Sequence, residues 1–146
     1  MKKLMAGRDR EGGASLVEFA MIMPLIIILL LGIIEFGWVF GQYNDVRHGA
    51  REGARLGAVN AGDNTALLND TCDSMDLTSP ASVEFVDGSG GSTGSTGSIT
   101  VVATPASLSG LGLIEVFLPA TLESEIEFRL EQDSDAWGSF GPTACP

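Results

Sequence analysis

Hydrophobic side chains are concentrated in one long run near the N-terminus. Residues 19–34 carry no charged side chain, and residues 25–34 are all apolar or glycine. Together with residues 14–18, the run is about 20 residues long, which is enough for a helix to cross ~30 Å of hydrocarbon. The pattern therefore predicts one transmembrane helix. One acid, Glu18, lies at the edge of this span, where a charge costs free energy and by default marks a functional site. Pro24 removes a helix hydrogen bond and predicts a kink.

The helical pattern continues beyond the apolar run as a predicted stalk. Residues 41–59 contain no proline, and residues 47–58 repeat Arg-x-Gly-Ala three times. Four residues advance about 400° around a helix, so the repeat predicts a stripe of arginines beside stripes of small residues. The arginines are Arg47, Arg51 and Arg55, and the glycines are Gly49, Gly53 and Gly57. Glycine costs about 1 kcal/mol relative to alanine in a helix, so we expect close helix packing to compensate. The packing partner can be another subunit or the chain's own domain, with the arginines then solvated.

Shorter patterns after the stalk predict a small domain with a sheet. Asp63 or Asn64 can cap a short helix that runs toward Cys72 and covers the sheet. Residues 82–86 and 99–102 are typical of strands, and the Gly/Ser-rich residues 88–98 between them predict a mobile loop. Residues 122–131 alternate strictly between apolar or small and charged side chains, which predicts a half-buried strand.

Two segments of this region carry a weaker pattern. Residues 108–119 are apolar without a clear period, which leaves a short helix, a membrane-facing loop and a core segment open. We expect the tail from Trp137 to Pro146 to be a loop. The predicted fold is α+β, with a long N-terminal transmembrane and stalk helix followed by a small antiparallel-sheet domain. We divide the chain into a leader (1–13), the transmembrane and stalk helix (14–61) and the small domain (62–146).

The charge distribution predicts the orientation of the span. Basic side chains precede it, and no further one occurs before Arg47. The positive-inside rule therefore predicts a cytoplasmic N-terminus and an extracytoplasmic domain. The leading basic residues are Lys2, Lys3, Arg8 and Arg10. The residues after the span are bulky, which disfavours the small-residue cleavage site of an ordinary secretory signal.

The whole chain of 146 residues carries a net charge of −11, which argues against nucleic acid and anionic lipid headgroups as partners because both need basic patches. The acidic row of residues 123–131 is expected to discourage edge-to-edge aggregation, with cation binding as the alternative.

Candidate chemistry is sparse. The two cysteines, Cys72 and Cys145, lie on the predicted translocated side, where a disulfide is expected and free thiols are the alternative. They and the lone His48 do not make a four-ligand metal site, so we expect no metal and no cofactor. The sequence offers no Ser/His/Asp set and no nucleotide loop, so we predict no catalytic residue and no enzyme.

One part of the sequence resembles a known family. Gly13 is followed by four residues, then by Glu18, Phe19 and the apolar run; residues 13–24 end in Pro24. Residues 32–37 then read Gly-Ile-Ile-Glu-Phe-Gly, and residues 50–55 read Ala-Arg-Glu-Gly-Ala-Arg. Over about residues 8–59, the chain is similar to TadE-like pseudopilins of tight-adherence (Tad) type IV pilus systems.

The resemblance implies a processed, non-enzymatic pilus protein. A prepilin peptidase would cut between Gly13 and Ala14, and Glu18 would pair with the N-terminal amine of a neighbouring subunit. The implied partners are this peptidase, other pilins or pseudopilins, Tad inner-membrane assembly proteins and membrane lipid. The implied location is the bacterial inner membrane, with one span, a periplasmic domain and incorporation into a surface pilus. The alternative is an uncleaved, signal-anchored periplasmic binding or scaffold module of an envelope complex.

Overall fold

The computed structural model of the chain describes residues 9–78, 80–108, 110 and 118–146. It contains two compact units, Met1–Gly37 and Trp38–Pro146. Helix α1 (Asp9–Ala58) contributes its N-terminal part to the first unit and the stalk to the second. Most of residues 108–119, for which the sequence left a short helix, a membrane-facing loop and a core segment open, lie outside the described residues.

The first unit is the apolar part of α1. Large apolar side chains are exposed all around this part of the helix, from Leu16 to Ile34. The described residues contain one helix that is long and apolar enough to cross a membrane, by length and composition. This agrees with the expected membrane anchor.

The helix begins before the apolar run. α1 starts at Asp9 and runs through Gly13. A glycine costs a helix only about 1 kcal/mol, and the hydrogen bonds of the turns on both sides offset that cost. α1 also continues through Pro24, where the kink stays a prediction.

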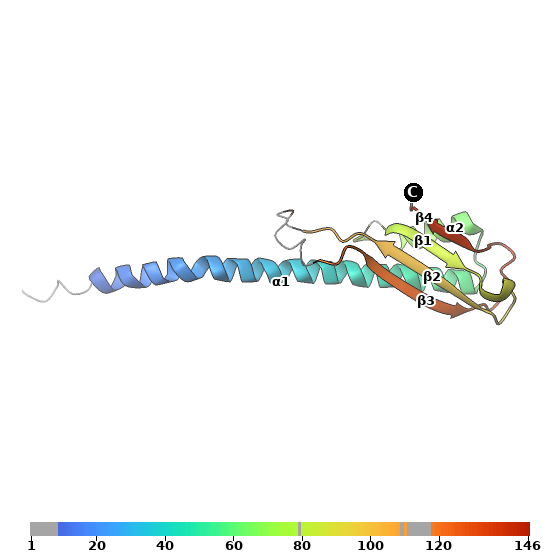
Figure 1. Cartoon of the computed structure of the whole chain (residues 1–146), viewed down its shortest axis with the longest axis horizontal. Coiled ribbons are helices and arrows are strands. Elements are labelled where there is room, and N and C mark those ends of the chain that lie inside the picture. The colour runs from blue at the N-terminus through green and yellow to red at the C-terminus, as the bar shows by residue number, and fades with distance from the viewer. Residues whose placement is uncertain (1–8, 79, 109, 111–117) are drawn as a thin grey trace, which may run out of the picture. The chain divides into compact units, whose positions relative to one another are not determined.

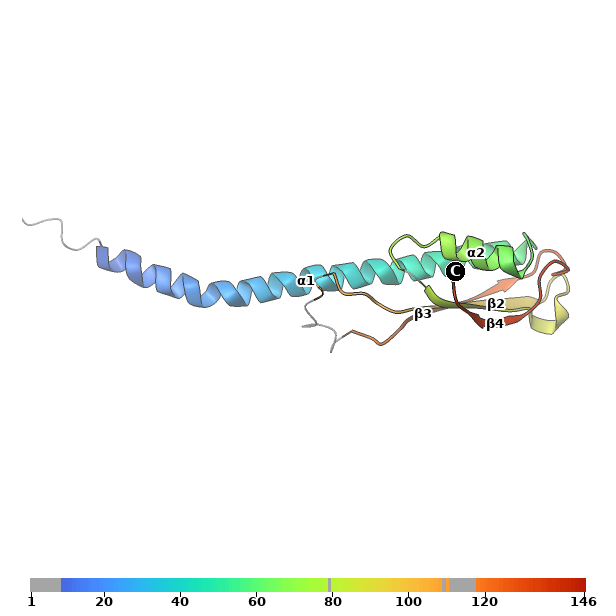
Figure 2. The same ribbon diagram turned by 90° about the horizontal axis from the view of Figure 1, so that it is seen from above.

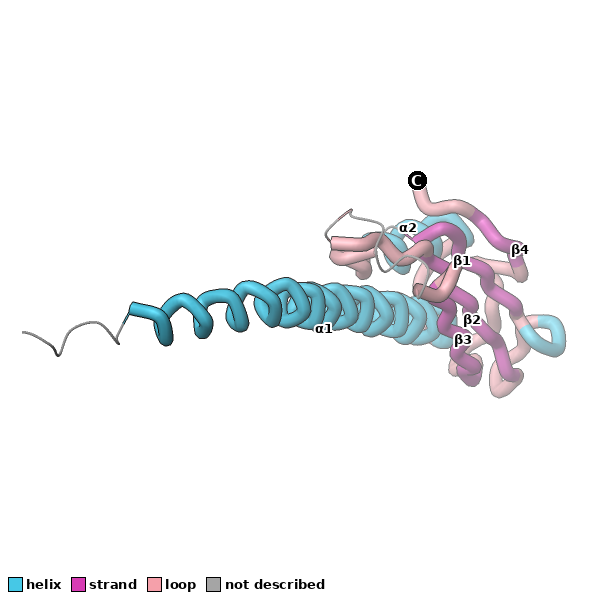
Figure 3. The backbone as a smooth tube through the Cα atoms, turned by 60° about the vertical axis from the view of Figure 1, so that its left-hand side comes forward, coloured by secondary structure: helices cyan, strands magenta, loops and turns pink. Residues whose placement is uncertain are grey.

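The second unit has a helical layer on one face of a sheet. The stalk part of α1 and α2 (Asn64–Asp73) lie on the same side of the sheet (Figures 1 and 2). The four strands are antiparallel in the order β3-β2-β1-β4 (Figure 3). Their bounds are Pro80–Val86 for β1, Thr96–Ala103 for β2, Leu122–Arg129 for β3 and Phe140–Thr143 for β4, with a short 3-10 helix, η1, at Gly88–Gly90. The predicted α+β class is confirmed.

The core fills the space between these two layers. Val46, Ala50 and Ala54 of the stalk are buried together with the inward side chains of the sheet. From the sheet and its connections come Val83, Phe85, Ile99, Val101, Ala103, Leu122, Leu130 and Trp137, and from α2 and the turn after it Leu67 and Met75. Trp137 also packs edge-on against Phe85, with ring centroids 5.7 Å apart.

The local predictions in this unit are largely confirmed. Asp63 caps α2, because its side chain accepts a hydrogen bond from the backbone N–H of Ala66 at 2.8 Å. The three predicted strands are present, and β3 alternates between exposed and more buried positions. The tail is not a loop throughout: β4 pairs with β1, and Phe140 stacks on Phe85 at 5.1 Å between centroids.

The Gly/Ser-rich loop is also more ordered than expected. It contains η1, and its last residues belong to β2. Asp133 accepts two hydrogen bonds from Thr93, both at 2.6 Å. The backbone N–H of Gly94 donates a hydrogen bond to the carbonyl of Leu130 at 2.7 Å. The segment after β3 therefore fixes this loop, a contact between residues about 40 positions apart. Hydrogen bonding by Thr93 lowers the pKa of Asp133.

Candidate processing and assembly segment

The predicted cleavage residues lie in the first unit on an exposed helix. Gly13, Ala14 and Glu18 are exposed, and a Cβ at Gly13 would meet open space within 4 Å. Ala14 and Glu18 are four residues apart, so they lie on the same side of the helix with a rise of about 6 Å between them. The neighbouring positions of the helix carry exposed apolar side chains, among them Leu16 at 70% and Phe19 at 59%. This arrangement leaves a charged group available to a partner outside the chain.

The glycines of the stalk face the chain's own domain. A Cβ at Gly49 would come within 2.5 Å of the Met75 sulfur, and one at Gly57 within 2.9 Å of the Phe128 ring. A Cβ at Gly53 would collide with the end of the Ile99 side chain and approach the Thr71 hydroxyl to 2.7 Å. The close packing that offsets the cost of these glycines is therefore found within one chain. The sequence left two packing partners open, another subunit and the chain's own domain. In the structure, the glycines pack against the chain's own domain.

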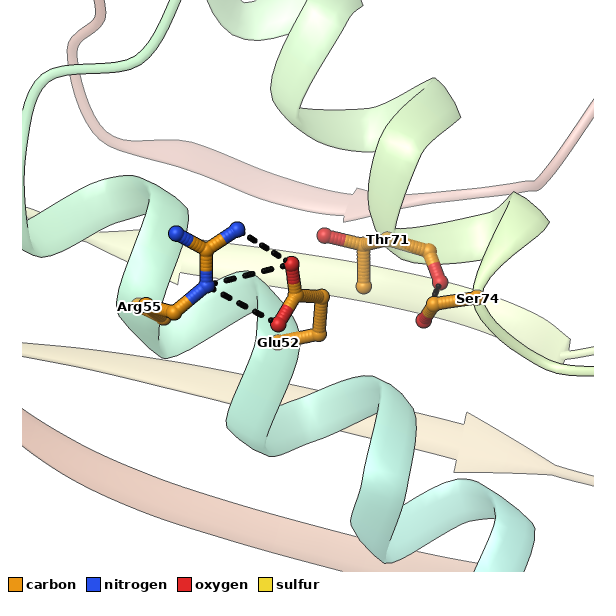
Figure 4. A network of polar contacts seen from close by, with 4 residues as sticks. All are labelled: Glu52, Arg55, Thr71 and Ser74. Carbon is orange, nitrogen blue, oxygen red and sulfur yellow. Dashed lines mark hydrogen bonds and ion pairs between the residues drawn. The ribbon is translucent and has the colours of Figure 1, made fainter.

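The arginines of the stalk point away from that packing. Arg47, Arg51 and Arg55 are all exposed. Arg47 lies 5.7 Å from the centre of the Tyr43 ring, and Arg55 binds Glu52 through an ion pair of 2.5 Å (Figure 4). The hydrogen bond and the charge of Arg55 lower the pKa of Glu52, while Glu52 raises that of Arg55. The stalk thus has a buried small-residue side and an exposed basic side.

Figure 4 also shows Thr71, which lies on α2 opposite the stalk. Its backbone carbonyl accepts a hydrogen bond from the Ser74 hydroxyl at 2.7 Å. Its own hydroxyl is buried and has no hydrogen-bond partner in the described part of the chain. Thr71 therefore fills the space beside Gly53, but its buried hydroxyl without a hydrogen-bond partner costs free energy of folding.

Sequence reasoning missed Asp45, which holds the segment between α2 and β1. Its carboxylate accepts hydrogen bonds from the backbone N–H groups of Asp76, Leu77 and Thr78 at 2.9–3.2 Å, and from the Thr78 hydroxyl at 2.8 Å. Partial burial raises the pKa of Asp45, but these four hydrogen bonds lower it by more, so the net pKa is below its ordinary value. Asp45 lies in the stalk, beyond the apolar span.

Gln42 makes a second tether that sequence reasoning missed. Its buried side-chain amide donates to the Ala106 carbonyl at 2.7 Å and accepts from the Ala106 N–H at 2.8 Å. Trp38 donates to the same carbonyl from its indole N–H at 3.0 Å. The only sequence signal for either tether was spacing, because residues 38, 42, 45 and 49 recur at helical intervals on the side that contains Gly49.

The C-terminal end of α1 is fixed by the strands' connections. Asn60 adopts a positive φ of 55°, and Ala61 donates to the Leu56 carbonyl at 3.1 Å, which together form a Schellman-type helix end. The carbonyls of Gly57 and Ala58 accept from the Trp137 indole at 3.2 Å and from the Glu131 N–H at 2.8 Å. The structure also has a disulfide between Cys72 and Cys145, with Cα atoms 6.0 Å apart.

The comparisons with known proteins point to the segment that carries Glu18 and the stalk. The described residues contain no group of three or more His, Cys, Asp or Glu that could hold a metal ion. The family model of TadE-like proteins matches residues 13–55, which begin at Gly13 and end at the last arginine of the stripe. No curated protein and no solved structure matches the chain. The resemblance inferred from the sequence is confirmed over residues 13–55, where the chain is similar to TadE-like proteins.

Proposed function

We propose that this chain is a minor pilin or pseudopilin that a prepilin peptidase cuts after Gly13 and that takes part in the assembly or initiation of a tight-adherence pilus. The observation that carries the proposal is the family match from Gly13 to Arg55, with one exposed carboxylate at the start of an uncovered apolar helix. Tad pilus proteins of this family are structural, so the proposal contains no catalytic step in this chain.

Cleavage would begin with the first turns of α1. A peptidase that binds an extended segment must unwind residues near Gly13, and Gly12-Gly13 lowers the free energy that this unwinding costs. Open space around Gly13 leaves the peptide bond accessible from the side. The cut would remove the four basic residues of the leader and leave Ala14 as the new N-terminus.

The new amine supplies a partner for Glu18. An α-amine has a reference pKa of about 7.7–8.0, so it is mostly protonated at neutral pH. In a bundle of apolar helices, an unpaired carboxylate costs several kcal/mol, so subunits that bring amine and carboxylate together are favoured over displaced ones. Glu18 lies one helical turn from its own Ala14, but a pair within one chain would not fix the register of two subunits. We therefore assign the pairing to a neighbouring pilin and give Glu18 a role in register.

The processing step is tested by the N-terminal sequence of the mature protein in cells with and without prepilin peptidase. We expect a start at Ala14 in the first case and at Met1 in the second. Gly13→Leu should block the cut, whereas the same change at Gly37, which also has open space around it, should leave the cut intact. An uncut chain in pilus-producing cells would instead favour the signal-anchored scaffold module.

The assembly step is tested with Glu18→Gln. We expect normal processing but loss of this chain from sheared pili, or loss of the pili themselves. Glu11→Gln is the matched control, because it makes the same change in the leader that the peptidase removes. Normal pilus assembly by the Glu18 variant would refute the proposed register role and leave the processing proposal standing.

A further inference from the structure

The second unit separates its charges by face. Trp38–Pro146 contains four arginines against fifteen aspartates and glutamates, and three of the four arginines form the stripe Arg47, Arg51 and Arg55. All three are exposed, and the nearby His48 is exposed as well. We name these three residues the arginine stripe. It is the basic surface of an otherwise strongly acidic unit.

The outer face of the sheet carries mostly the opposite charge, and Arg129 at the end of β3 lies on the same face. Glu123, Glu125 and Glu127 alternate along β3 and are exposed. Thr100 of β2 lies opposite Glu125 of β3 on one side and opposite Glu84 of β1 on the other. The three residues form one row across the sheet, so the acidic surface extends to β1. We name these four glutamates the acidic sheet face. Side chains of β2 between them, such as Thr100, supply hydroxyl groups that can accept from guanidinium N–H groups.

These two surfaces cannot meet within one chain. The glycine side of the stalk contacts Ile99 and Phe128, which project from the inner face of the sheet. The arginine stripe points away from this contact, and the glutamates project from the other side of the strands, because neighbouring residues of a strand point to opposite faces. Arg47, Arg51 and the glutamates are therefore available to another molecule, whereas Arg55 already pairs with Glu52.

The spacings of the two surfaces agree. Arginines four residues apart on a helix are separated by about 6 Å along its axis. Glutamates two residues apart on a strand are separated by about 6.8 Å. Three arginines and three glutamates thus match to within about 1 Å per step when the stalk lies along β3. In Figure 1, β3 runs at a slant to the stalk, so such a contact inclines the stalks of the two molecules to each other.

We propose that the arginine stripe of one chain docks on the acidic sheet face of a second copy of the same chain. The partner is a second copy because one chain carries both surfaces, with opposite sign and matching spacing. The contact is head-to-tail, so each copy keeps one free stripe or sheet face and can add another. It requires neither cleavage at Gly13 nor the carboxylate of Glu18, and therefore stands apart from the proposed processing.

The test uses the full chain in detergent micelles at low ionic strength, with two differently tagged populations that are mixed and purified through one tag. The stripe variant is R47E/R51E, which leaves Arg55 with its ion pair to Glu52, and the sheet variant is E125K/E127K. Each variant alone brings like charges together, and we expect its association to weaken at least tenfold. A mixture of the two variants restores opposite charges at every contact and should recover the association.

Three controls complete the test. D70K/D73K makes the same charge change as the sheet variant at exposed residues of α2 and should associate as the unsubstituted chain does. The disulfide and the tryptophan fluorescence report that each variant is folded. High salt should weaken the association, because the screening length falls from about 10 Å at 0.1 M to about 3 Å at 1 M.

The proposal is overturned if both single-face variants associate as the unsubstituted chain does, or if their mixture fails to recover. It is also overturned if the unsubstituted chain does not associate with itself while its stripe binds vesicles of anionic lipid.

Discussion

Removal of the Asp45 carboxylate should destabilise the second unit, Trp38–Pro146. Asp45→Ala leaves three backbone N–H groups and the Thr78 hydroxyl without their acceptor. Asp76 and Leu77 are exposed, so water can replace the carboxylate there. Thr78 is only 7% exposed, so its two donors become buried and unsatisfied, at about 1 kcal/mol or more each. We therefore expect a loss of about 2 kcal/mol in the free energy of unfolding.

The assay is equilibrium unfolding of the full chain in urea and detergent, followed by the fluorescence of Trp38 and Trp137, which both lie in this unit. A loss of about 2 kcal/mol corresponds to a midpoint lowered by about 1 M urea. Thr78→Val keeps the carboxylate and three of its four bonds, so it should cost about half as much. Equal midpoints for the unsubstituted chain and Asp45→Ala would refute the reasoning.

The same carboxylate predicts a pH dependence. The pKa of Asp45 is lowered in the folded state, so its contribution is present above its ordinary value of 3.8 and is lost as pH falls through the folded pKa. The difference in stability between the unsubstituted chain and Asp45→Asn should therefore be constant from neutral pH to about pH 5 and shrink below pH 4. A difference that grows in acid would contradict the assignment.

Four further variants test the packing and the disulfide. Gly53→Ala should lower the unfolding free energy by about 1 kcal/mol, because an overpacking cost of about 2 kcal/mol exceeds the gain in helix propensity. Gly49→Ala, whose three nearest contacts are all atoms of the flexible Met75 side chain, should be neutral or stabilising in the same urea titration. Thr71→Val replaces a buried hydroxyl that has no hydrogen-bond partner in the described part of the chain. It should raise the free energy of unfolding by up to about 1 kcal/mol and shift the urea midpoint upward. The double change C72S/C145S removes a disulfide that closes a loop of 73 residues. The loss of this constraint on the unfolded chain should lower the free energy of unfolding by about 4 kcal/mol, compared with the disulfide-bonded protein in the absence of reductant.

The sequence allowed the prediction of elements whose signal is local. The cap at Asp63 needs only residues of the next helical turn, and β3 alternates within its own eight residues. The apolar run needs only its length. β4 was missed because Phe140–Thr143 has neither alternation nor strong strand propensity. It forms because β1 offers a free edge, Phe140 stacks on Phe85, and the disulfide holds the tail nearby.

The tethers of the stalk were missed for a similar reason. Asp45 binds residues more than 30 positions away, and Gln42 binds Ala106 at a separation of 64. Polar residues on a helix are by themselves compatible with solvent, so only the fold shows which of them face a partner. The glycine repeat had two interpretations for the same reason, because close packing of a helix leaves the same sequence pattern whether the partner is internal or external.

The Arg-x-Gly-Ala repeat explains how the stalk has one buried side of small residues and one exposed basic side. Each arginine precedes its glycine by two residues, which is about 200° around the helix, so an arginine is exposed wherever a glycine is buried. A period of four residues also drifts by about 40° per repeat relative to the helix. The glycines accordingly contact different parts of the domain in turn: Met75 after α2, then Thr71 and Ile99, then Phe128 and Phe85 on the sheet. The repeat thus packs the stalk across the domain, and the arginine stripe turns around the stalk by the same drift. Substitutions at the arginines should therefore affect what the stalk binds, whereas substitutions at Gly53 should affect whether the domain folds onto it.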